Sequence, residues 1–181
     1  MQGAIGVGYR LYLLVLDGDS EAGVADASFG ISYGANLLVN SWILCADLDF
    51  DGGPSGVSWP DSGSGNVMTW AECQDTVAEG DSTGGVTAVL GAVYVYAYGK
   101  DVFEITKRNY IDEPDFQVAN CEAQTSDIPY PDHAGSVGFG STAGYDPCQD
   151  QEEMAGGGTE GTIPKVWTQT MSGSFELVLQ P

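Results

Sequence analysis

Short apolar runs of β-type residues recur along most of the chain, and each run ends in a cluster of Gly, Asp, Ser or Pro. Helical periodicity is nearly absent, and this combination is typical of all-β proteins. From Ile5 to Leu16 every second residue is apolar, as in a strand with one buried face. The run from Val86 to Tyr98 is apolar on both faces, which suits a central strand or a sheet covered on both sides. We therefore expect an all-β sandwich, Ig-like or jelly-roll-like, of about 8–10 strands.

The chain has 181 residues, enough for one ordinary domain with a core of its own. We expect this β-sandwich domain to occupy residues 1–148. Residues 149–162 are rich in Gly and acidic side chains and predict a linker. Residues 163–181 contain two compact strand signals and form a C-terminal strand extension. Within the domain, Gly99-Lys100-Asp101 predicts a hairpin between the strand that ends at Tyr98 and a strand at 102–107.

The charge of the chain excludes several partners. There are 26 Asp+Glu against 5 Lys+Arg, for a formal net charge of −21. Nucleic acid is not expected as a partner, because phosphate binding needs clustered Lys and Arg. No apolar stretch is long enough to span a bilayer, so we expect no membrane insertion.

Four cysteines, Cys45, Cys73, Cys121 and Cys148, form an even set without a CxxC pair. Zinc sites usually contain such close pairs, so we expect two disulfides rather than metal ligation, with four buried free thiols as the alternative. The N-terminal run contains Arg10 and lacks a cleavage site, so it is not a signal peptide. Together with the low Lys content, the cysteines favour an extracellular mature chain over a cytosolic protein.

Several segments in order along residues 12–148 resemble a family of secreted, uncharacterised β domains from environmental bacteria. The matching segments are Tyr12-Leu13-Leu14-Val15, Phe29-Gly30-Ile31, Trp42-Ile43-Leu44-Cys45-Ala46-Asp47-Leu48, Gly65-Asn66-Val67-Met68-Thr69-Trp70 with Cys73, Tyr94-Val95-Tyr96-Ala97-Tyr98, Asn120-Cys121, Gly138-Phe139-Gly140 and Gly144-Tyr145-Asp146-Pro147-Cys148. The family has no known activity to transfer. The resemblance implies export and the nearest-neighbour disulfides Cys45–Cys73 and Cys121–Cys148.

The chain departs from this family at both ends. Family members usually carry an extra strand before the segment that begins at Tyr12, and here that region is very short. After the last cysteine the chain adds a linker and a strand pair. A missing first strand with a surplus last strand resembles the arrangement of donor-strand pilins, whose subunits complete one another's sheets. No pilin sequence motif accompanies this arrangement.

The last strand signal has the pattern that a donor strand needs. Phe175, Leu177 and Leu179 are spaced two apart and would enter pockets of a neighbouring copy while the backbone pairs with its sheet edge. Ile5 and Val7 are a second donor candidate at the N-terminus. A 14-residue linker can reach up to about 45 Å. The alternative is that the tail packs on its own domain.

From this pattern we expect the structural subunit of an extracellular bacterial filament, a head-to-tail homopolymer and not an enzyme. The alternative function is a secreted monomeric carbohydrate-binding or adhesive module that acts on surface glycans. Trp42, Trp59, Trp70 and Trp167 could stack on sugars, and Trp59 is the best exposed candidate because it lies in a Gly/Pro/Ser loop. His133 is expected to be a surface histidine, since no Gly-x-Ser-x-Gly accompanies it.

One short acidic motif could bind a cation. Asp47, Asp49 and Asp51 precede Gly52 with the spacing of the first half of a calcium loop. Position twelve of such a loop would be Ser58 rather than the usual Glu. The same residues also fit a strand with an acidic solvent face. Ca²⁺ is therefore a candidate ligand and no other cofactor is expected.

Overall fold

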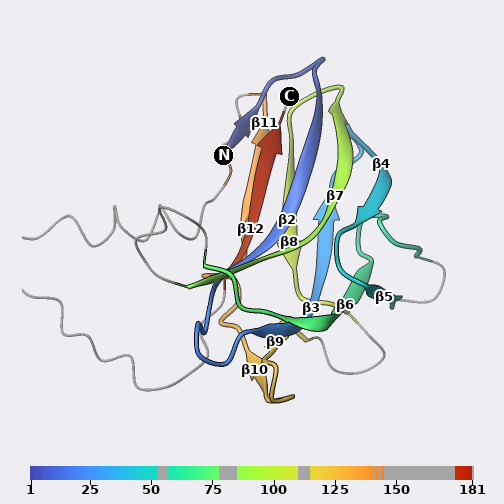
Figure 1. Ribbon diagram of the computed structural model, residues 1–181. Helices are drawn as coiled ribbons and strands as arrows, with labels where there is room; N and C mark the ends of the chain where they lie inside the picture. The colour runs from blue at the N-terminus through green and yellow to red at the C-terminus, as the bar shows by residue number, and fades with distance from the viewer. Residues whose placement is uncertain are drawn as a thin grey trace, which may run out of the picture.

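The computed structural model describes residues 1–52, 57–77, 85–109, 115–140, 142, 144 and 174–180. In this part of the chain the strands form two sheets that pack face to face, so the protein is an all-β sandwich (Figure 1). This confirms the fold class expected from the alternating pattern. Among these residues no helix is long and apolar enough to cross a membrane.

The larger sheet, called sheet A, has the strand order β1-β11-β8-β3-β6-β5. Strand β9 also pairs with β3, and β10 pairs with β9. All pairs are antiparallel except β1 with β11. The strands of sheet A are β1 (Gln2–Gly3), β3 (Val24–Tyr33), β5 (Leu48–Asp51), β6 (Gly65–Gln74), β8 (Asp101–Thr106), β9 (Gln117–Ala119), β10 (Thr125–Asp127) and β11 (Ser136–Phe139).

The smaller sheet, called sheet B, has the strand order β12-β2-β7-β4 and is antiparallel throughout. Its strands are β2 (Gly8–Gly18), β4 (Leu37–Leu44), β7 (Val86–Ala97) and β12 (Ser174–Gln180). The central pair, β2 and β7, carries the two longest apolar patterns of the sequence. A bulge interrupts β4 between Asn40 and Ile43, and there the indole of Trp42 lies against Gly91, where any side chain would collide with it.

The core lies between the sheets and takes alternate side chains from both. Leu11, Leu13 and Val15 point inward from β2, whereas the residues between them are partly exposed. Phenylalanines dominate the buried volume, as the largest fully buried side chains are Phe29, Phe103, Phe139 and Phe175. Apolar burial of this kind is the main favourable contribution to folding.

The expected hairpin at Gly99-Lys100-Asp101 is wrong, because the two strands that it joins belong to different sheets. Strand β7 pairs with β2 and β4, and β8 pairs with β3 and β11. The connection crosses the sandwich beside the link from β3 to β4. The Asp101 carboxylate accepts the N–H groups of Gly34 and Asn36 at 3.1 and 3.0 Å, which ties the two crossings together.

The nearest-neighbour disulfide pairing is also wrong. Cys73 bonds to Cys121, at a sequence separation of 48. Cys73 is in β6 and Cys121 follows β9. These two strands flank β3 on opposite sides, so both cysteines come close to the beginning of β3. Gly23, at φ 66°, packs under the disulfide where a Cβ would collide with both sulfurs. Within the described residues Cys45 is free and exposed, and Cys148 lies outside them.

Candidate functional site

The C-terminal strand lies in a groove beside β2. Seven consecutive residues of β12, from Ser174 to Gln180, pair with β2 in a continuous antiparallel register, from Leu16 back to Arg10. Figure 1 shows β12 at the edge of sheet B, alongside β2. Phe175 and Leu177 are 0% and 1% exposed, and Leu179 packs against the same core. The spacing of two therefore gives these side chains one inward face, as the sequence predicts.

Aromatic contacts anchor the beginning of this strand. The ring of Phe175 lies between two others, with its centroid 4.5 Å from that of Phe116 and 5.4 Å from that of Phe29. Phe29 comes from β3 of the opposite sheet, so Phe175 joins the two layers. Sequence reasoning did not identify Phe29 and Phe116 as groove residues, because only the packing of the sheets brings them together.

The backbone of Phe175 bridges the two sheets as well. Its N–H donates to the His133 carbonyl at 2.9 Å, and its carbonyl accepts the Gly135 N–H at 2.8 Å. The segment that leads into β11 thus forms a second wall of the groove. His133 takes part through its backbone carbonyl.

The strand completes the sheet of its own chain. This is the alternative expected for the tail, and in the single chain Phe175, Leu177 and Leu179 occupy their own core rather than that of a second copy. The strand belongs to the sandwich rather than to a separate extension. The expected linker at 149–162 and the strand signal at 163–171, which holds Trp167, lie outside the described residues.

The N-terminal donor candidate does not have donor geometry. Ile5 and Val7 are exposed in the connection between β1 and β2. Strand β1 pairs in parallel with β11 of its own sheet, with Gln2 opposite Gly138. In the single chain the two side chains therefore do not alternate into a groove, and donation of this segment to another copy stays a prediction.

Asp49 and Asp51 of the calcium candidate belong to the edge strand β5, and Asp47 lies directly before it. Each carboxylate accepts a hydrogen bond from a neighbouring segment: Asp47 from the Ala71 N–H, Asp49 from the Asn66 amide and Asp51 from the Trp59 N–H. Same-face residues of a strand lie about 7 Å apart, too far for three to share one ion at about 2.5 Å. In the described part of the chain no three metal-ligating side chains gather. The segment therefore fits the alternative expectation, a strand with an acidic solvent face.

Trp59 is not the exposed sugar platform that its loop suggested. Its indole ring packs edge-on against Phe29, with centroids 5.6 Å apart, and against Trp42 at 5.2 Å. Trp42, Trp59 and Trp70 all pack partly against the core. A loop rich in Gly, Pro and Ser can fold back over an open sandwich edge, and composition alone does not distinguish this from exposure.

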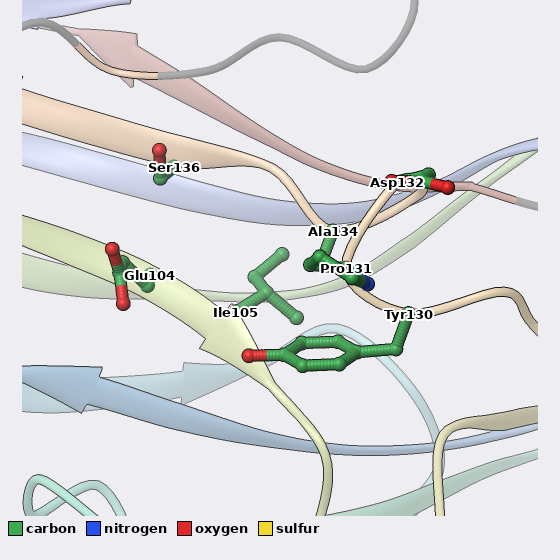
Figure 2. A pocket seen from close by; sticks show the side chains of 7 residues that line it. All are labelled: Glu104, Ile105, Tyr130, Pro131, Asp132, Ala134 and Ser136. Carbon is green, nitrogen blue, oxygen red and sulfur yellow. The ribbon is translucent and has the colours of Figure 1, made fainter.

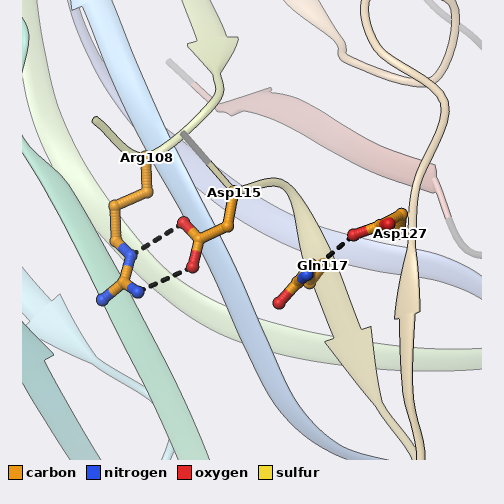
Figure 3. Close-up of polar contacts among 4 residues, drawn as sticks. All are labelled: Arg108, Asp115, Gln117 and Asp127. Atoms are coloured by element: carbon orange, nitrogen blue, oxygen red, sulfur yellow. Dashed lines mark hydrogen bonds and ion pairs between the residues drawn. The ribbon is translucent and has the colours of Figure 1, made fainter. Parts of the chain in front are cut away.

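A charged cluster lies on the side of β3 that faces away from the core. Arg108 and Asp115 form a bidentate ion pair at 2.9 and 2.7 Å (Figure 3). Burial acts to raise the pKa of Asp115, but the hydrogen bonds to its carboxylate and the charge of Arg108 together outweigh burial and hold the pKa below its ordinary value. Burial raises the pKa of nearby Asp26, with Arg108 opposing the rise and Asp115 adding to it.

A hollow of about 400 Å³ opens beside the groove. Figure 2 shows the ring of Tyr130 and the side chain of Ile105 in the middle of its lining, with Glu104 and Ser136 on one side. Asp132, Pro131 and Ala134 complete the wall. Sequence reasoning did not identify Tyr130, whose ring is partly exposed.

Comparison with known proteins gives one distant structural similarity. No family model and no curated protein matches the chain. A solved structure, the cohesin module from Clostridium perfringens ATCC13124 family 33 glycoside hydrolase, is similar with a TM-score of 0.46 and 14% sequence identity. The match covers 76% of this chain and 87% of that chain.

Proposed function

We propose that this chain is a structural subunit of an extracellular bacterial filament, in which copies exchange their C-terminal strands. One observation carries the proposal. The side chains of Phe175 and Leu177 are completely buried in the core. In the sequence, however, the 29 residues from 145 to 173 separate their strand from the rest of the described fold. At roughly 3.3 Å per residue such a stretch can reach about 95 Å, far enough for the groove of another copy.

Exchange costs little in contact energy because every contact of the closed chain can form again between copies. Removal of β12 uncovers the edge of β2 and a groove lined by Phe29 and Phe116. An open edge of this kind is a template for another strand of the same sequence. The linker keeps the chain's own strand at an effective concentration on the order of mM, so dilute protein stays closed and crowded protein exchanges.

The remaining features support export and a structural role. The Cys73–Cys121 disulfide fits an oxidising compartment. The net charge of −21 keeps assemblies from aggregating with one another indiscriminately. The C-terminal strand that completes the sheet is the element that the proposal exchanges between copies, and the role proposed for the chain is therefore assembly rather than catalysis.

An engineered disulfide distinguishes the closed form from the exchanged form. Leu16 and Ser174 are direct cross-strand partners, so their Cα atoms lie about 4.5–5.5 Å apart, within the range of a disulfide. The variant Leu16→Cys/Ser174→Cys is made in a background with serine at positions 45 and 148. It is refolded from denaturant at dilute and at mM concentration and then oxidised.

The proposal predicts a monomer band from the dilute sample and a ladder of covalent multimers from the concentrated sample on non-reducing gels. Leu16→Cys alone is the control, because a single added cysteine can give dimers but no ladder. A monomer band at every concentration, with no filaments in electron micrographs, would refute strand exchange.

The hollow beside Tyr130 supports a second candidate function, that of a carbohydrate-binding module. A half-exposed aromatic ring with Glu104, Asp132 and Ser136 around it offers a stacking surface and hydroxyl partners for a sugar. The test is binding to a glycan array by the locked monomer. Tyr130→Ala should abolish binding, whereas Trp59→Ala should lower the melting temperature and leave binding unchanged. Absence of any bound glycan contradicts this candidate.

A further inference from the structure

The outer face of sheet B, which points away from the core, is largely apolar, and its polar row holds Asn40, Arg10 and Gln180 beside Tyr94. Its middle row runs from Val178 on β12 through Tyr12 and Ala92 to Ile43 on β4. This face, called the apolar face below, is made of eight large side chains: Tyr12, Leu14, Leu38, Ile43, Val89, Tyr94, Tyr96 and Val178.

The strand register and the burial of alternate residues assign these side chains to the outside. On β7, Val93 and Val95 are buried in the core, so Tyr94 and Tyr96 lie on the other side. The hydroxyl of Tyr94 reaches over Gly8 of the neighbouring strand, where any Cβ would collide with it. Leu38 and Ile43 are 41% and 46% exposed.

The solvent face of an antiparallel sandwich is normally polar, and contiguous apolar patches usually mark an interaction site. The Val86–Tyr98 pattern suits a central strand or a sheet that is covered on both sides, and β7 is a central strand of sheet B. Within the described residues only the inner side is covered, by the core. The outer side is therefore the side on which a partner could pack.

We propose that the apolar face binds the same face of a second copy of this chain. Charge is the first argument for this occupant. The chain has 26 acidic residues. The face is formed by residues 8–16 of β2 and by the three other strands of sheet B. In this region Glu176 is the one acidic residue that the register places on the face. Two copies with a net charge of −21 each repel least through the face where carboxylates are fewest.

The second argument is that the two charged positions on the face are complementary under two-fold symmetry. Arg10 is opposite Gln180 near one end of the β2–β12 ladder, and Glu176 is opposite Leu14 four residues away. A two-fold axis that runs across the strands reverses their direction. It therefore brings the Arg10 end of one copy over the Glu176 end of the other, as a self-complementary interface requires.

The third argument is continuity with strand exchange, on which this part of the inference rests. Strand β12 forms one edge of the apolar face, so every exchanged subunit presents the complete face. Four strands at about 4.8 Å spacing and some 25 Å long give on the order of 400 Å² per copy, roughly half of a standard interface. Isolated copies should associate weakly, whereas copies arrayed along a filament should associate strongly, because many contacts act together.

The test uses the oxidised Leu16→Cys/Ser174→Cys monomer, in which strand exchange is blocked, so the two proposals can fail separately. Sedimentation equilibrium is measured from micromolar to millimolar protein at low and high salt. The proposal predicts a reversible dimer that strengthens as salt screens the acidic surfaces. The double substitution Leu38→Glu/Ile43→Glu should weaken dimerisation at least tenfold.

Two controls make the result specific. Phe50→Glu adds a carboxylate at a similarly exposed apolar residue, 56% exposed on β5 of the other sheet, and should leave dimerisation unchanged. Arg10→Glu should weaken the dimer, and Glu176→Arg in the same chain should restore it. The proposal is overturned if the locked chain stays monomeric at millimolar concentration, as it would with the face covered by its own residues or by another protein. It is equally overturned if Phe50→Glu weakens the dimer as much as the double substitution does.

Discussion

Substitution of Phe175 measures how much of the fold depends on the C-terminal strand. The side chain is completely buried between Phe29 and Phe116, in the last strand of the chain. Removal of a buried phenylalanine ring costs about 3–5 kcal/mol, including the cavity that remains. The total stability of a domain is about 5–15 kcal/mol. We therefore expect Phe175→Ala to remove a large fraction of the free energy of unfolding.

Urea unfolding of dilute, closed monomer is the assay for this loss. With a slope of about 2 kcal/mol per molar urea, the midpoint should fall by about 2 M. Gln180→Ala changes an exposed residue of the same strand and should shift stability by less than about 0.5 kcal/mol. A double-mutant cycle with Phe116→Ala should show a coupling of about 0.5–1.5 kcal/mol, because the two rings are in contact.

Two results would refute the reasoning. If Phe175→Ala shifts the midpoint no more than Gln180→Ala, the strand does not contribute to the core. If the coupling with Phe116 is absent while the loss remains large, the strand stabilises the fold through other contacts than the ring pair. The first outcome also removes the energetic basis of the exchange proposal.

Three further predictions follow from other parts of the fold. Cys73→Ser removes the Cys73–Cys121 disulfide and should lower the free energy of unfolding by about 4 kcal/mol, the value that the chain-entropy relation gives for a separation of 48 residues. Cys45→Ser, at a free and exposed cysteine, should leave the midpoint of urea unfolding unchanged. Asp26→Asn should raise the free energy of unfolding at pH 7, because burial raises the pKa of Asp26 and its ionisation therefore destabilises the fold. This gain in stability should shrink as the pH falls through the raised pKa toward the ordinary value of 3.8. Asp115→Asn should do the opposite at pH 7, since its lowered pKa means that the ionised form stabilises the fold, and urea unfolding at several pH values checks both signs. Excess EDTA should leave the melting temperature unchanged, because Asp47, Asp49 and Asp51 accept hydrogen bonds along a strand; a fall of several degrees would contradict this.

Local patterns in the sequence predict the strands well but not their partners. The strand expected within Ile5–Leu16 runs from Gly8 to Gly18, and the run from Val86 ends one residue earlier than expected. The same pattern at Phe175, Leu177 and Leu179 identifies the inward face of β12. These signals are local, because a strand with one buried face alternates whatever lies beside it.

Partners depend on contacts that are distant in sequence. A short turn such as 99–101 can join strands of one sheet or cross between two sheets, and the sequence of the turn does not distinguish them. The disulfide joins Cys73 to Cys121 because β6 and β9 both flank β3, which sequence spacing does not reveal. The aspartates before Gly52 fit a calcium loop and an edge strand equally well until the strand pairing with β6 is known.

The uninterrupted register between β12 and β2 has a mechanical consequence. A pull on the strand from its Ser174 end acts along the strand axis, so it loads all seven registered pairs at once instead of peeling them one by one. The ring of Phe175 must leave its contacts with Phe29 and Phe116 in the same event. In a filament of exchanged copies, tension would load each exchanged strand in shear. The lifetime of the filament under load would be set by the rate at which this strand slides out of its groove.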